Sequence, residues 1–300
     1  MTIYDARAAS AETFILGEGP VWDAALNRVL WVDINRGEVL EGILADDAVE
    51  LTVRHSFDGT VGAVAPAADG RLLVAGQEEL VVVSVTGGRT RGPRIVPAGI
   101  GSRANDGATD PAGHFVIGTL SLDTREGQEG LFRVEDNGVL TVIDDDLWLS
   151  NGIAWSADGS LLYTVDTVQQ VVWVRDYNAR TGAIGARREH IRVTDGLPDG
   201  ICMDTAGNLW IAMWGAGEVR CYAPDGTVLD LVRVRAPHTS SVAFVGPDRD
   251  LLLITTAQQG LTSAQLNEYP DSGRLFTARV NAVGLATTAW SGSWAAPVSP

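Results

Sequence analysis

The chain has 300 residues, 45% of them hydrophobic and 20% charged, which is the composition of a folded globular protein and excludes a long disordered chain. Acidic residues outnumber basic ones by 38 to 22, so the formal charge is −16 and the surface should repel nucleic acid and anionic membranes. The basic residues are all Arg, which excludes lysine Schiff-base chemistry and lysine-containing phosphate loops.

Cysteine content and hydropathy indicate the compartment. Cys202 and Cys221 are too few to form a disulfide framework in a chain of this size. The N-terminus lacks a basic and an apolar signal region, and no apolar run approaches the ~18 residues of a membrane span. We therefore expect a soluble cytoplasmic protein, either a monomer or a small homo-oligomer, with neither membrane nor nucleic acid as a partner.

Two β-rich runs joined by a turn form a pattern that recurs six times along the chain. The copies cover residues 19–33, 61–76, 106–120, 151–167, 199–215 and 240–257. They begin at intervals of roughly 41 to 48 residues, the period of a propeller blade with four short strands. The sequence therefore predicts an all-β fold, a six-bladed β-propeller that occupies residues 1–300 as a single domain.

Local signals between and within the copies agree with this fold. Asn-Gly or Asp-Gly pairs suited to tight hairpin turns lie between β-forming residues at 69–70, 137–138, 158–159 and 225–226. A short helical turn is expected only around Thr262–Tyr269. Because an open propeller would expose an edge strand, we expect Thr13–Leu16 to pair with C-terminal strands in the last blade.

Propeller geometry predicts where polar side chains gather. The innermost strand of each blade begins at one mouth of the central channel, so the residues at these six starts should form a ring: Glu18, Thr60, Asn105, Asn151, Asp199 and Thr239. All of them offer oxygen ligands, as a hard cation requires. The second strands return to the same face and bring Asp123 near Asn105, while the preceding loop brings Arg103; Asp33, Asp166 and Trp214 could shape the rim.

Four motifs within these copies resemble a known family. LGEGPVWD, SRANDGATDP, SNGIAWSADG and LPDGICMD, with the tail GLTSAQLNEYPDSGRLF, are similar to motifs of the senescence-marker-protein/gluconolactonase/regucalcin family. The agreement extends in order from about Leu16 to Phe276. The resemblance implies a six-bladed propeller with one divalent metal ion in its channel and a sugar lactonase activity, that is, a carboxylic ester hydrolase of carbohydrate metabolism.

The resemblance also implies particular residue roles. The family's metal-binding positions fall on Glu18, Asn151 and Asp199, and its sugar-contacting Arg and Asn fall on Arg103 and Asn105. A further substrate-binding position, often Glu in the family, falls on Asp123. The shorter side chain leaves this contact, and with it the preferred sugar, open.

The implied reaction is hydrolysis of an aldono-lactone of a pentose or hexose to the aldonic acid. The ion would polarise the lactone carbonyl, and Asp199 would accept the proton of the attacking water. Since a metal-bound carboxylate is a weaker base, hydroxide on the ion is the alternative nucleophile. Oxygen ligands admit Ca²⁺, Zn²⁺, Mn²⁺, Mg²⁺ or Fe²⁺.

Other interpretations of these residues remain open. Asn151-Gly152 and Asp199-Gly200 are also common turn pairs, and residues 144–146, three consecutive Asp, are expected in a solvated loop. The four His show neither zinc-protease spacing nor a nucleophile motif. Alternative functions are a calcium-binding, regucalcin-like regulatory protein and hydrolysis of non-sugar esters or lactones.

Overall fold

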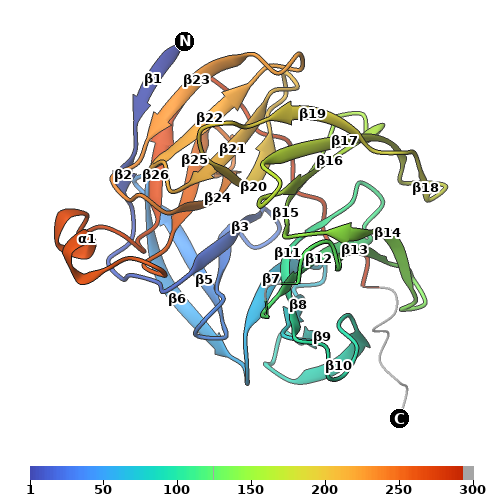
Figure 1. Ribbon diagram of the computed structural model, residues 1–300. Helices are drawn as coiled ribbons and strands as arrows, with labels where there is room; N and C mark the ends of the chain where they lie inside the picture. Colours follow the sequence, from blue (N-terminus) through green and yellow to red (C-terminus); the bar gives the residue numbers. More distant parts are fainter. Residues whose placement is uncertain (124, 293–300) are drawn as a thin grey trace.

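Six β-sheets surround a central axis in the computed structural model, which describes residues 1–123 and 125–292 (Figure 1). This arrangement confirms the six-bladed β-propeller. In each blade the innermost strand is the first of the repeat, and the following strands pair outward in chain order.

The strands of the first three blades follow the predicted repeats. Blade 1 contains β3 (Gly17–Asp23), β4 (Arg28–Asp33), β5 (Glu38–Ala45) and β6 (Ala48–Ser56). Blade 2 contains β7 (Val61–Pro66), β8 (Leu72–Gly76), β9 (Glu79–Val83) and β10 (Arg89–Arg94). Blade 3 contains β11 (Ser102–Thr109), β12 (Phe115–Ser121), β13 (Glu129–Val134) and β14 (Leu140–Leu147).

The other three blades recruit additional strands. Blade 4 contains β15 (Ser150–Trp155), β16 (Leu161–Asp166), β17 (Val171–Asn178), β18 (Ala183–Ile184) and β19 (Arg188–Arg192). Blade 5 contains β20 (Leu197–Met203), β21 (Leu209–Trp214), β22 (Glu218–Tyr222), β23 (Val228–Arg233) and β1 (Thr2–Asp5). Blade 6 contains β24 (Thr239–Val245), β25 (Leu251–Thr256), β26 (Phe276–Arg279) and β2 (Arg7–Ala8).

The predicted hairpin turns are present, and their glycines explain why. Gly70, Gly138, Gly159 and Gly226 have φ of 85°, 80°, 69° and 84°, values that favour glycine. In each turn the preceding Asp or Asn side chain accepts a hydrogen bond from the backbone N–H two residues further on, at 2.9–3.2 Å. Side chain and glycine together therefore fix these turns.

The N-terminal segment closes the propeller, but not with the predicted residues. The outer strand of blade 6 is β2, which pairs antiparallel with β26, while β1 adds parallel to β23 of blade 5. Thr13–Leu16 meets the last blade through the bridge between Leu16 and Ala257 and through backbone hydrogen bonds from Phe14 to Gly273 and from Gln258 to Ile15, but it does not form the strand that we expected. Phe14 is fully buried against Trp31. This anchor holds its segment inside the ring, so the outer edge of blade 6 is completed by residues further upstream.

The expected helical turn is confirmed as α1 (Ser263–Glu268). The Thr262 side chain accepts a hydrogen bond from the backbone N–H of Gln265, and the Gln265 side chain accepts one from Thr262 N–H, which makes a capping box. Within the described part of the chain, no helix is long and apolar enough to cross a membrane.

The expectation of a solvated loop at residues 144–146 is wrong. These residues lie in β14, where Asp144 is buried and forms ion pairs with Arg175 and Arg187. Arg187 also pairs with Asp146 at 2.6 Å. Two arginines from the neighbouring blade compensate the burial of the carboxylate, a pairing that strand patterning along β14 could not reveal.

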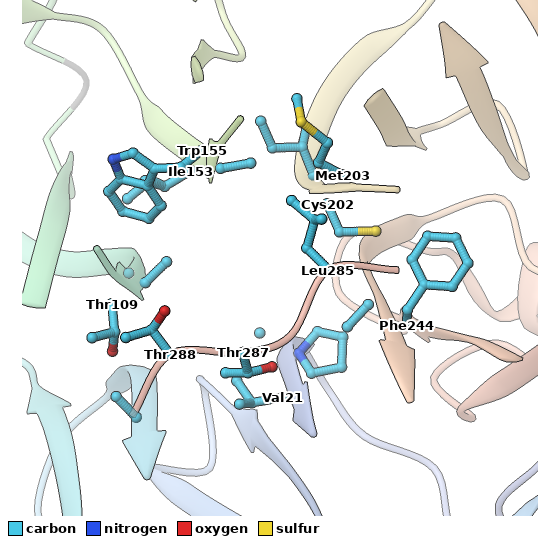
Figure 2. Close-up of a pocket in the computed structure, with 18 of the residues that line it drawn as sticks. Val21, Thr109, Ile153, Trp155, Cys202, Met203, Phe244, Leu285, Thr287 and Thr288 are labelled. Carbon is cyan, nitrogen blue, oxygen red and sulfur yellow. The ribbon is translucent and has the colours of Figure 1, made fainter. Parts of the chain in front are cut away.

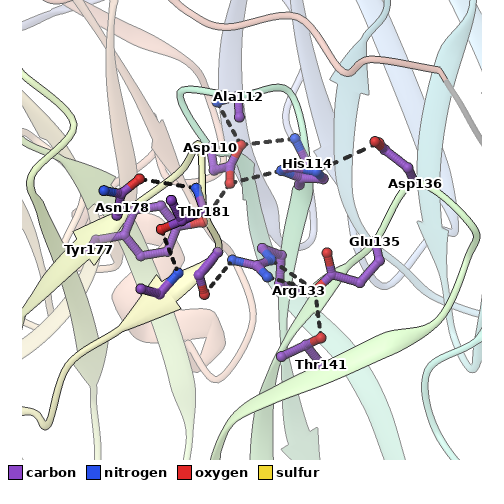
Figure 3. Close-up of polar contacts among 12 residues, drawn as sticks. Asp110, Ala112, His114, Arg133, Glu135, Asp136, Thr141, Tyr177, Asn178 and Thr181 are labelled. Atoms are coloured by element: carbon purple, nitrogen blue, oxygen red, sulfur yellow. Dashed lines mark hydrogen bonds and ion pairs between the residues drawn. The ribbon is translucent and has the colours of Figure 1, made fainter.

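Neighbouring blades also lock together through buried polar groups (Figure 3). Asp110 follows β11 and accepts hydrogen bonds from the backbone N–H groups of Ala112 and His114, at 2.8 and 2.9 Å. Tyr177 of blade 4 donates its hydroxyl proton to the same carboxylate. One side chain thus caps a turn of blade 3 and binds it to blade 4.

Candidate functional site

Every inner strand carries a β-bulge at the same end. The register of the first strand pair shifts after Glu18, Val61, Ala104, Asn151, Pro198 and Thr239 in the six blades. A bulge breaks the alternation of side chains and re-aims the residues within it. The six bulges therefore direct side chains from six distant stretches of sequence toward one end of the channel.

Close packing of the inner strands explains the glycines beside the predicted ligands. A Cβ on Gly152 would lie 2.5 Å from the backbone oxygen of Asp199, and one on Gly200 would lie 2.0 Å from Ser241 Oγ. Neither glycine has a positive φ. The pairs Asn151-Gly152 and Asp199-Gly200 are therefore not turns; they allow neighbouring blades to approach near the axis.

A chain of hydrogen bonds crosses the mouth from blade 3 to blade 5. Arg103 Nη1 donates to Asn105 Oδ1 at 2.7 Å, and Asn105 Nδ2 donates to Asn151 Oδ1 at 3.1 Å. Asn151 Nδ2 donates to Thr167 Oγ1 at 3.0 Å, and that hydroxyl donates to the carbonyl oxygen of Pro198 at 2.7 Å. The chain fixes the side-chain orientation of both asparagines and ends on the residue before Asp199.

Three carboxyl groups share the centre of the propeller. Burial raises the pKa of Glu18 to about 8, with a further contribution from the charge of Asp106, while Gly19 N–H and Arg103 act in the opposite direction. Burial, then Glu18 and Asp106, also raise the pKa of Asp199. The bulges of β3 and β20 carry Glu18 and Asp199 to the same end of the channel, and the charge of Glu18 contributes to the raised pKa of Asp199, although the two residues lie 181 positions apart in the sequence.

Arg103 is the basic group that faces these carboxyls. Burial lowers its pKa to about 10, and the charges of Glu18 and Asp199 oppose that shift. One cation cannot neutralise three acidic side chains, so ionisation of all three in this place is costly unless a further cation is bound.

The donor set fits a hard divalent cation. Asp199 Oδ1 is buried and has no hydrogen-bond partner among the described residues. Asn151 Oδ1 accepts a single hydrogen bond, so it keeps a free lone pair. Residues 1–123 and 125–292 contain no cluster of three or more His, Cys, Asp or Glu arranged to hold a metal, so a site here needs the asparagine amide between the two carboxylates.

Asp123, the further substrate-binding residue that we expected, lies outside the buried cluster. Asp123 is exposed and accepts hydrogen bonds from Ser121 Oγ and Arg125 Nε, both at 2.6 Å. The Ser121 hydroxyl and then Arg125 lower the pKa of this carboxyl. Its partners are thus on its own loop, and a contact with a substrate held by Arg103 and Asn105 stays a prediction.

Asp33 and Asp166 do not form the rim that we expected. Both are fully buried. Asp33 accepts hydrogen bonds from the backbone of Ile15 and Leu16, and Asp166 from that of Trp148 and Leu149, at 2.8–3.3 Å. These hydrogen bonds hold the segments that lead into blades 1 and 4. Trp214, the third residue expected at the rim, stacks on His238 with a centroid separation of 4.2 Å. Thr60 and Thr239 keep their places before or at the start of inner strands.

Two residues escaped prediction. Asp106 follows Asn105 in the bulge of β11, and strict strand alternation would have turned it away from Asn105. Thr167 follows β16, and only the folded chain brings its hydroxyl between Asn151 and Pro198. The adjacent pair Asn105-Asp106 was the available signal for the first, and the sequence contains none for the second.

Comparisons with known proteins identify relatives of this chain. The family description SMP-30/Gluconolactonase/LRE-like region matches residues 16–258. A pentonolactonase of Haloferax volcanii is 36% identical over 244 residues, which cover 81% of each chain. A 6-deoxy-6-sulfogluconolactonase of Pseudomonas putida is 32% identical and covers 93% of this chain and 96% of its own.

A solved structure extends the likeness to the fold. The calcium-binding protein regucalcin of Agrobacterium tumefaciens superimposes with a TM-score of 0.90 at 29% identity, covering 97% of this chain and 99% of its own. The matched region contains all six bulges that converge on the channel mouth. The chain therefore belongs to the SMP-30/gluconolactonase family.

Proposed function

We propose that this protein is a metal-dependent sugar lactonase that hydrolyses an aldono-lactone of a pentose or hexose to the aldonic acid. The observation that carries the proposal is the polar cluster at the channel mouth, where buried carboxyls, two oriented amides and one arginine meet. Relatives named as pentonolactonase and 6-deoxy-6-sulfogluconolactonase support the reaction class.

Glu18, Asn151 and Asp199 would hold one divalent cation. All three ligand atoms are oxygens, a set that admits Ca²⁺, Mg²⁺, Mn²⁺, Zn²⁺ or Fe²⁺. When bound, such an ion supplies Lewis acidity toward a lactone carbonyl. Two carboxylates would offset its charge, and the neutral amide of Asn151 would preserve part of that acidity.

Arg103 and Asn105 would bind and orient the sugar. Arg103 Nη1 donates to Asn105 Oδ1 and to the carbonyl oxygen of Ala104, and the Nε and Nη2 N–H groups are left for ring hydroxyls. Polyol recognition distinguishes a sugar lactone from an apolar ester, which would gain nothing from such donors. Asp123 would add a weaker contact from the rim.

Asp199 is the candidate general base. Burial and the nearby carboxyls raise its pKa, so the group holds a proton more tightly than an ordinary Asp. Its unpartnered Oδ1 would accept the proton of the water that attacks the carbonyl carbon. As the C–O ring bond breaks, Asp199 would return that proton to the ring oxygen, which becomes a hydroxyl. The carboxylic acid then loses a proton to solvent, and the carboxylate is repelled by a protein of formal charge −16.

A calcium-binding role without catalysis is the second candidate, since a structural neighbour is described as a calcium-binding protein, regucalcin. A bare binding site would not require Arg103 and Asn105 beside the ion. Calcium affinity measured without substrate, together with lactone turnover, separates the two roles.

The deciding experiment is a screen of xylono-, arabino-, glucono- and galactono-lactones after chelation and restoration of each metal. We expect turnover to disappear on chelation and to return with at least one metal. Asp199→Asn should reduce kcat by about 10²–10⁴-fold, since a positioned base contributes that much, and should weaken metal affinity.

Asp225→Asn is the matched control, because it makes the same chemical change at an exposed hairpin turn in the same blade. It should leave turnover and metal affinity unchanged. Full activity after exhaustive chelation would contradict metal dependence, and no turnover of any lactone with any metal would contradict the lactonase itself.

A further inference from the structure

Thr167 lies beside Asn151, one of the residues proposed to hold the metal ion. It follows β16 and is buried, and its hydroxyl accepts a hydrogen bond from Asn151 Nδ2 at 3.0 Å and donates one to the carbonyl oxygen of Pro198 at 2.7 Å. Its side chain makes no other hydrogen bond within the described chain. The hydroxyl therefore joins blade 4, which carries Asn151, to the strand of blade 5 that carries Asp199.

The fold does not require a hydroxyl at this position. The backbone N–H of Thr167 donates to the carbonyl oxygen of Leu149, the residue before β15, at 3.2 Å. Ile34 and Ala257 take the same place after the second strands of blades 1 and 6, and each donates to the residue before its inner strand, at 2.9 and 3.0 Å. Both have apolar, buried side chains. The Thr167 hydroxyl thus serves the groups that it contacts and not the propeller fold.

The two contacts of the hydroxyl determine how the Asn151 amide is oriented. The Pro198 carbonyl can only accept a hydrogen bond, so it takes the single hydroxyl proton of Thr167. The hydroxyl oxygen then accepts from an N–H group, and the amide presents Nδ2 to it. A flipped amide would place Oδ1 against an oxygen without an available proton. Asn151 Oδ1 is therefore held on the side away from Thr167, where it accepts from Asn105.

The same orientation extends to the residues proposed to bind the sugar. Asn105 Nδ2 donates to the carbonyl oxygen of Ser150 at 2.9 Å and to Asn151 Oδ1 at 3.1 Å. Asn105 Oδ1 is thereby left to accept from Arg103 Nη1 at 2.7 Å. A flip of the Asn151 amide would bring two N–H donors together and displace Asn105 from Arg103. One hydroxyl thus supports both the metal-binding and the sugar-binding groups.

The rest of β15 cannot replace the Thr167 hydroxyl. Asn151 Nδ2 needs a hydrogen-bond acceptor, and residues 152–155 are Gly, Ile, Ala and Trp, none of which carries an acceptor in its side chain. Ile153 and Trp155 instead line a mainly apolar cavity of about 370 Å³ at the opposite end of the channel (Figure 2). Loss of the hydroxyl would therefore leave the amide nitrogen without a side-chain partner from its own strand.

We propose that Thr167 is a positioning residue, which holds Asn151 Oδ1 toward the metal ion and, through Asn151, keeps Asn105 and Arg103 in place for the sugar. This role rests on the proposed function, and it gives Thr167 no contact with either ligand. Because the hydrogen bonds are buried and continuous, the two binding sites share one anchor. Metal affinity and sugar affinity should therefore both depend on the same hydroxyl.

Calorimetric titration of the metal-free full chain with calcium chloride and with manganese chloride tests the metal site. Thr167→Val keeps the shape of the side chain but removes the hydroxyl, so metal affinity should fall by about tenfold, the effect of one buried hydrogen bond. Thr167→Ser keeps the hydroxyl and should bind metal nearly as tightly as the unsubstituted protein. Thr164→Val is the matched control, since it makes the same change in β16 at a buried hydroxyl without a hydrogen-bond partner in the described chain. It should leave metal affinity unchanged.

Lactone kinetics in saturating metal test the sugar site. Thr167→Val should raise KM by about 2–10-fold, with a smaller change in kcat, because Asp199 and the ion are retained. Thr167→Ser should restore KM. A packing role would give the opposite ranking, since Val preserves the volume of Thr whereas Ser leaves a methyl-sized gap.

If Thr167→Val fails to fold, the Ser variant still decides, because a loss of metal affinity of about tenfold in that variant would overturn the proposal. Equal metal affinity of the Val variant and the unsubstituted protein would also overturn it, while leaving the metal site intact. If the unsubstituted protein bound neither metal, the proposed metal site would fail and this role with it. Affinity that is lost in Val and kept in Ser, without turnover of any lactone, would support the role of Thr167 at the metal and contradict only the lactonase.

Discussion

At Glu18, the burial of a carboxyl group lowers the stability of the folded protein whenever the group is ionised. Its carboxyl is buried near two other carboxyls, and its pKa in the metal-free protein is about 8 against an ordinary value of 4.5. Buried carboxyls this close together oppose folding at neutral pH unless a cation is bound. Binding sites in general lower the stability of a protein for reasons of this kind.

This shift gives a prediction for the metal-free protein. Between pH 4.5 and 8 the folded state keeps a proton on Glu18 that the unfolded state releases, so the stabilising contribution is complete below 4.5 and disappears as the pH rises through 8. Glu18→Gln is neutral throughout. Its Tm should exceed that of the unsubstituted protein at pH 9, by about 2–4 °C per kcal/mol gained, and the difference should shrink toward pH 5.

Thermal unfolding in the presence of a chelator at both pH values provides the measurement. Glu50→Gln, at an exposed position of β6, is the control and should leave Tm unchanged at either pH. A Glu18→Gln protein that is less stable at pH 9 would show that the carboxylate is compensated without metal.

Arg103 acts on both the substrate and the charge of the site, and two substitutions separate these effects. Arg103→Ala should raise KM, with a loss of kcat/KM of about 10–100-fold, the equivalent of a charge-assisted hydrogen bond worth about 1.5–3 kcal/mol. Arg103→Lys keeps the charge near Glu18 and Asp199 but loses the planar donor geometry.

Steady-state kinetics in saturating metal check this prediction. If Arg103 binds the sugar through its geometry, the Lys variant should resemble the Ala variant in KM. Restoration of KM by Lys would instead assign Arg103 a purely electrostatic role, and an unchanged KM in both would remove it from the substrate site.

At the scale of single elements, the bulge is the feature that converts a repeated strand into a site. Every inner strand except β20, which starts at the exposed Leu197, begins with a buried residue, and all six shift register within their first few residues. The same bulge brings Asn105 into the hydrogen-bond chain at the mouth and places Asp106 where its charge acts on Glu18 and Asp199. One irregularity thus supplies the mouth with two adjacent polar side chains.

The N-terminal elements differ in how much each contributes to the stability of the fold. β1 is mostly exposed and only extends the edge of blade 5, whereas Phe14 is fully buried and Ser10 bonds to the segment before β26. Deletion of residues 1–16 should therefore lower Tm steeply, while deletion of residues 1–5 should have a small effect. Phe14→Ala should cost about 3–5 kcal/mol, the usual loss for a buried Phe.

Differential scanning calorimetry of the three variants tests this ranking. Equal destabilisation by the two deletions would mean that β1, and not the Phe14 anchor, closes the ring. An unchanged Tm after deletion of residues 1–16 would mean that blade 6 needs no N-terminal partner.

For the molecule as a whole, ring closure brings the six blades to one axis and divides the channel into two ends of different chemistry. The mouth is polar and carries Arg103, whereas the opposite end is lined mainly by apolar side chains such as Ile153, Met203 and Leu285. The protein as a whole carries a formal charge of −16, which favours the approach of cations over anions to either end of the channel.

The sequence by itself determined the repeat, its period and the hairpin turns, because strand alternation and Asn-Gly or Asp-Gly pairs are local properties. It also indicated Glu18, Asn105, Asn151 and Asp199, since each stands at the start of an inner strand. Their assigned roles came from resemblance to a family and stay predictions.

Only the tertiary structure decided how these residues meet. The bulge that turns Asp106 toward the axis, the buried ion pairs of Asp144 and the hydrogen bond from Asn151 to Thr167 depend on which strands lie beside one another. Closure by β2, and the contacts of the C-terminal segment with Met203 and Pro66, depend on where the two ends of the chain return to the ring. Contacts between distant segments leave no local pattern, so the sequence could not reveal them.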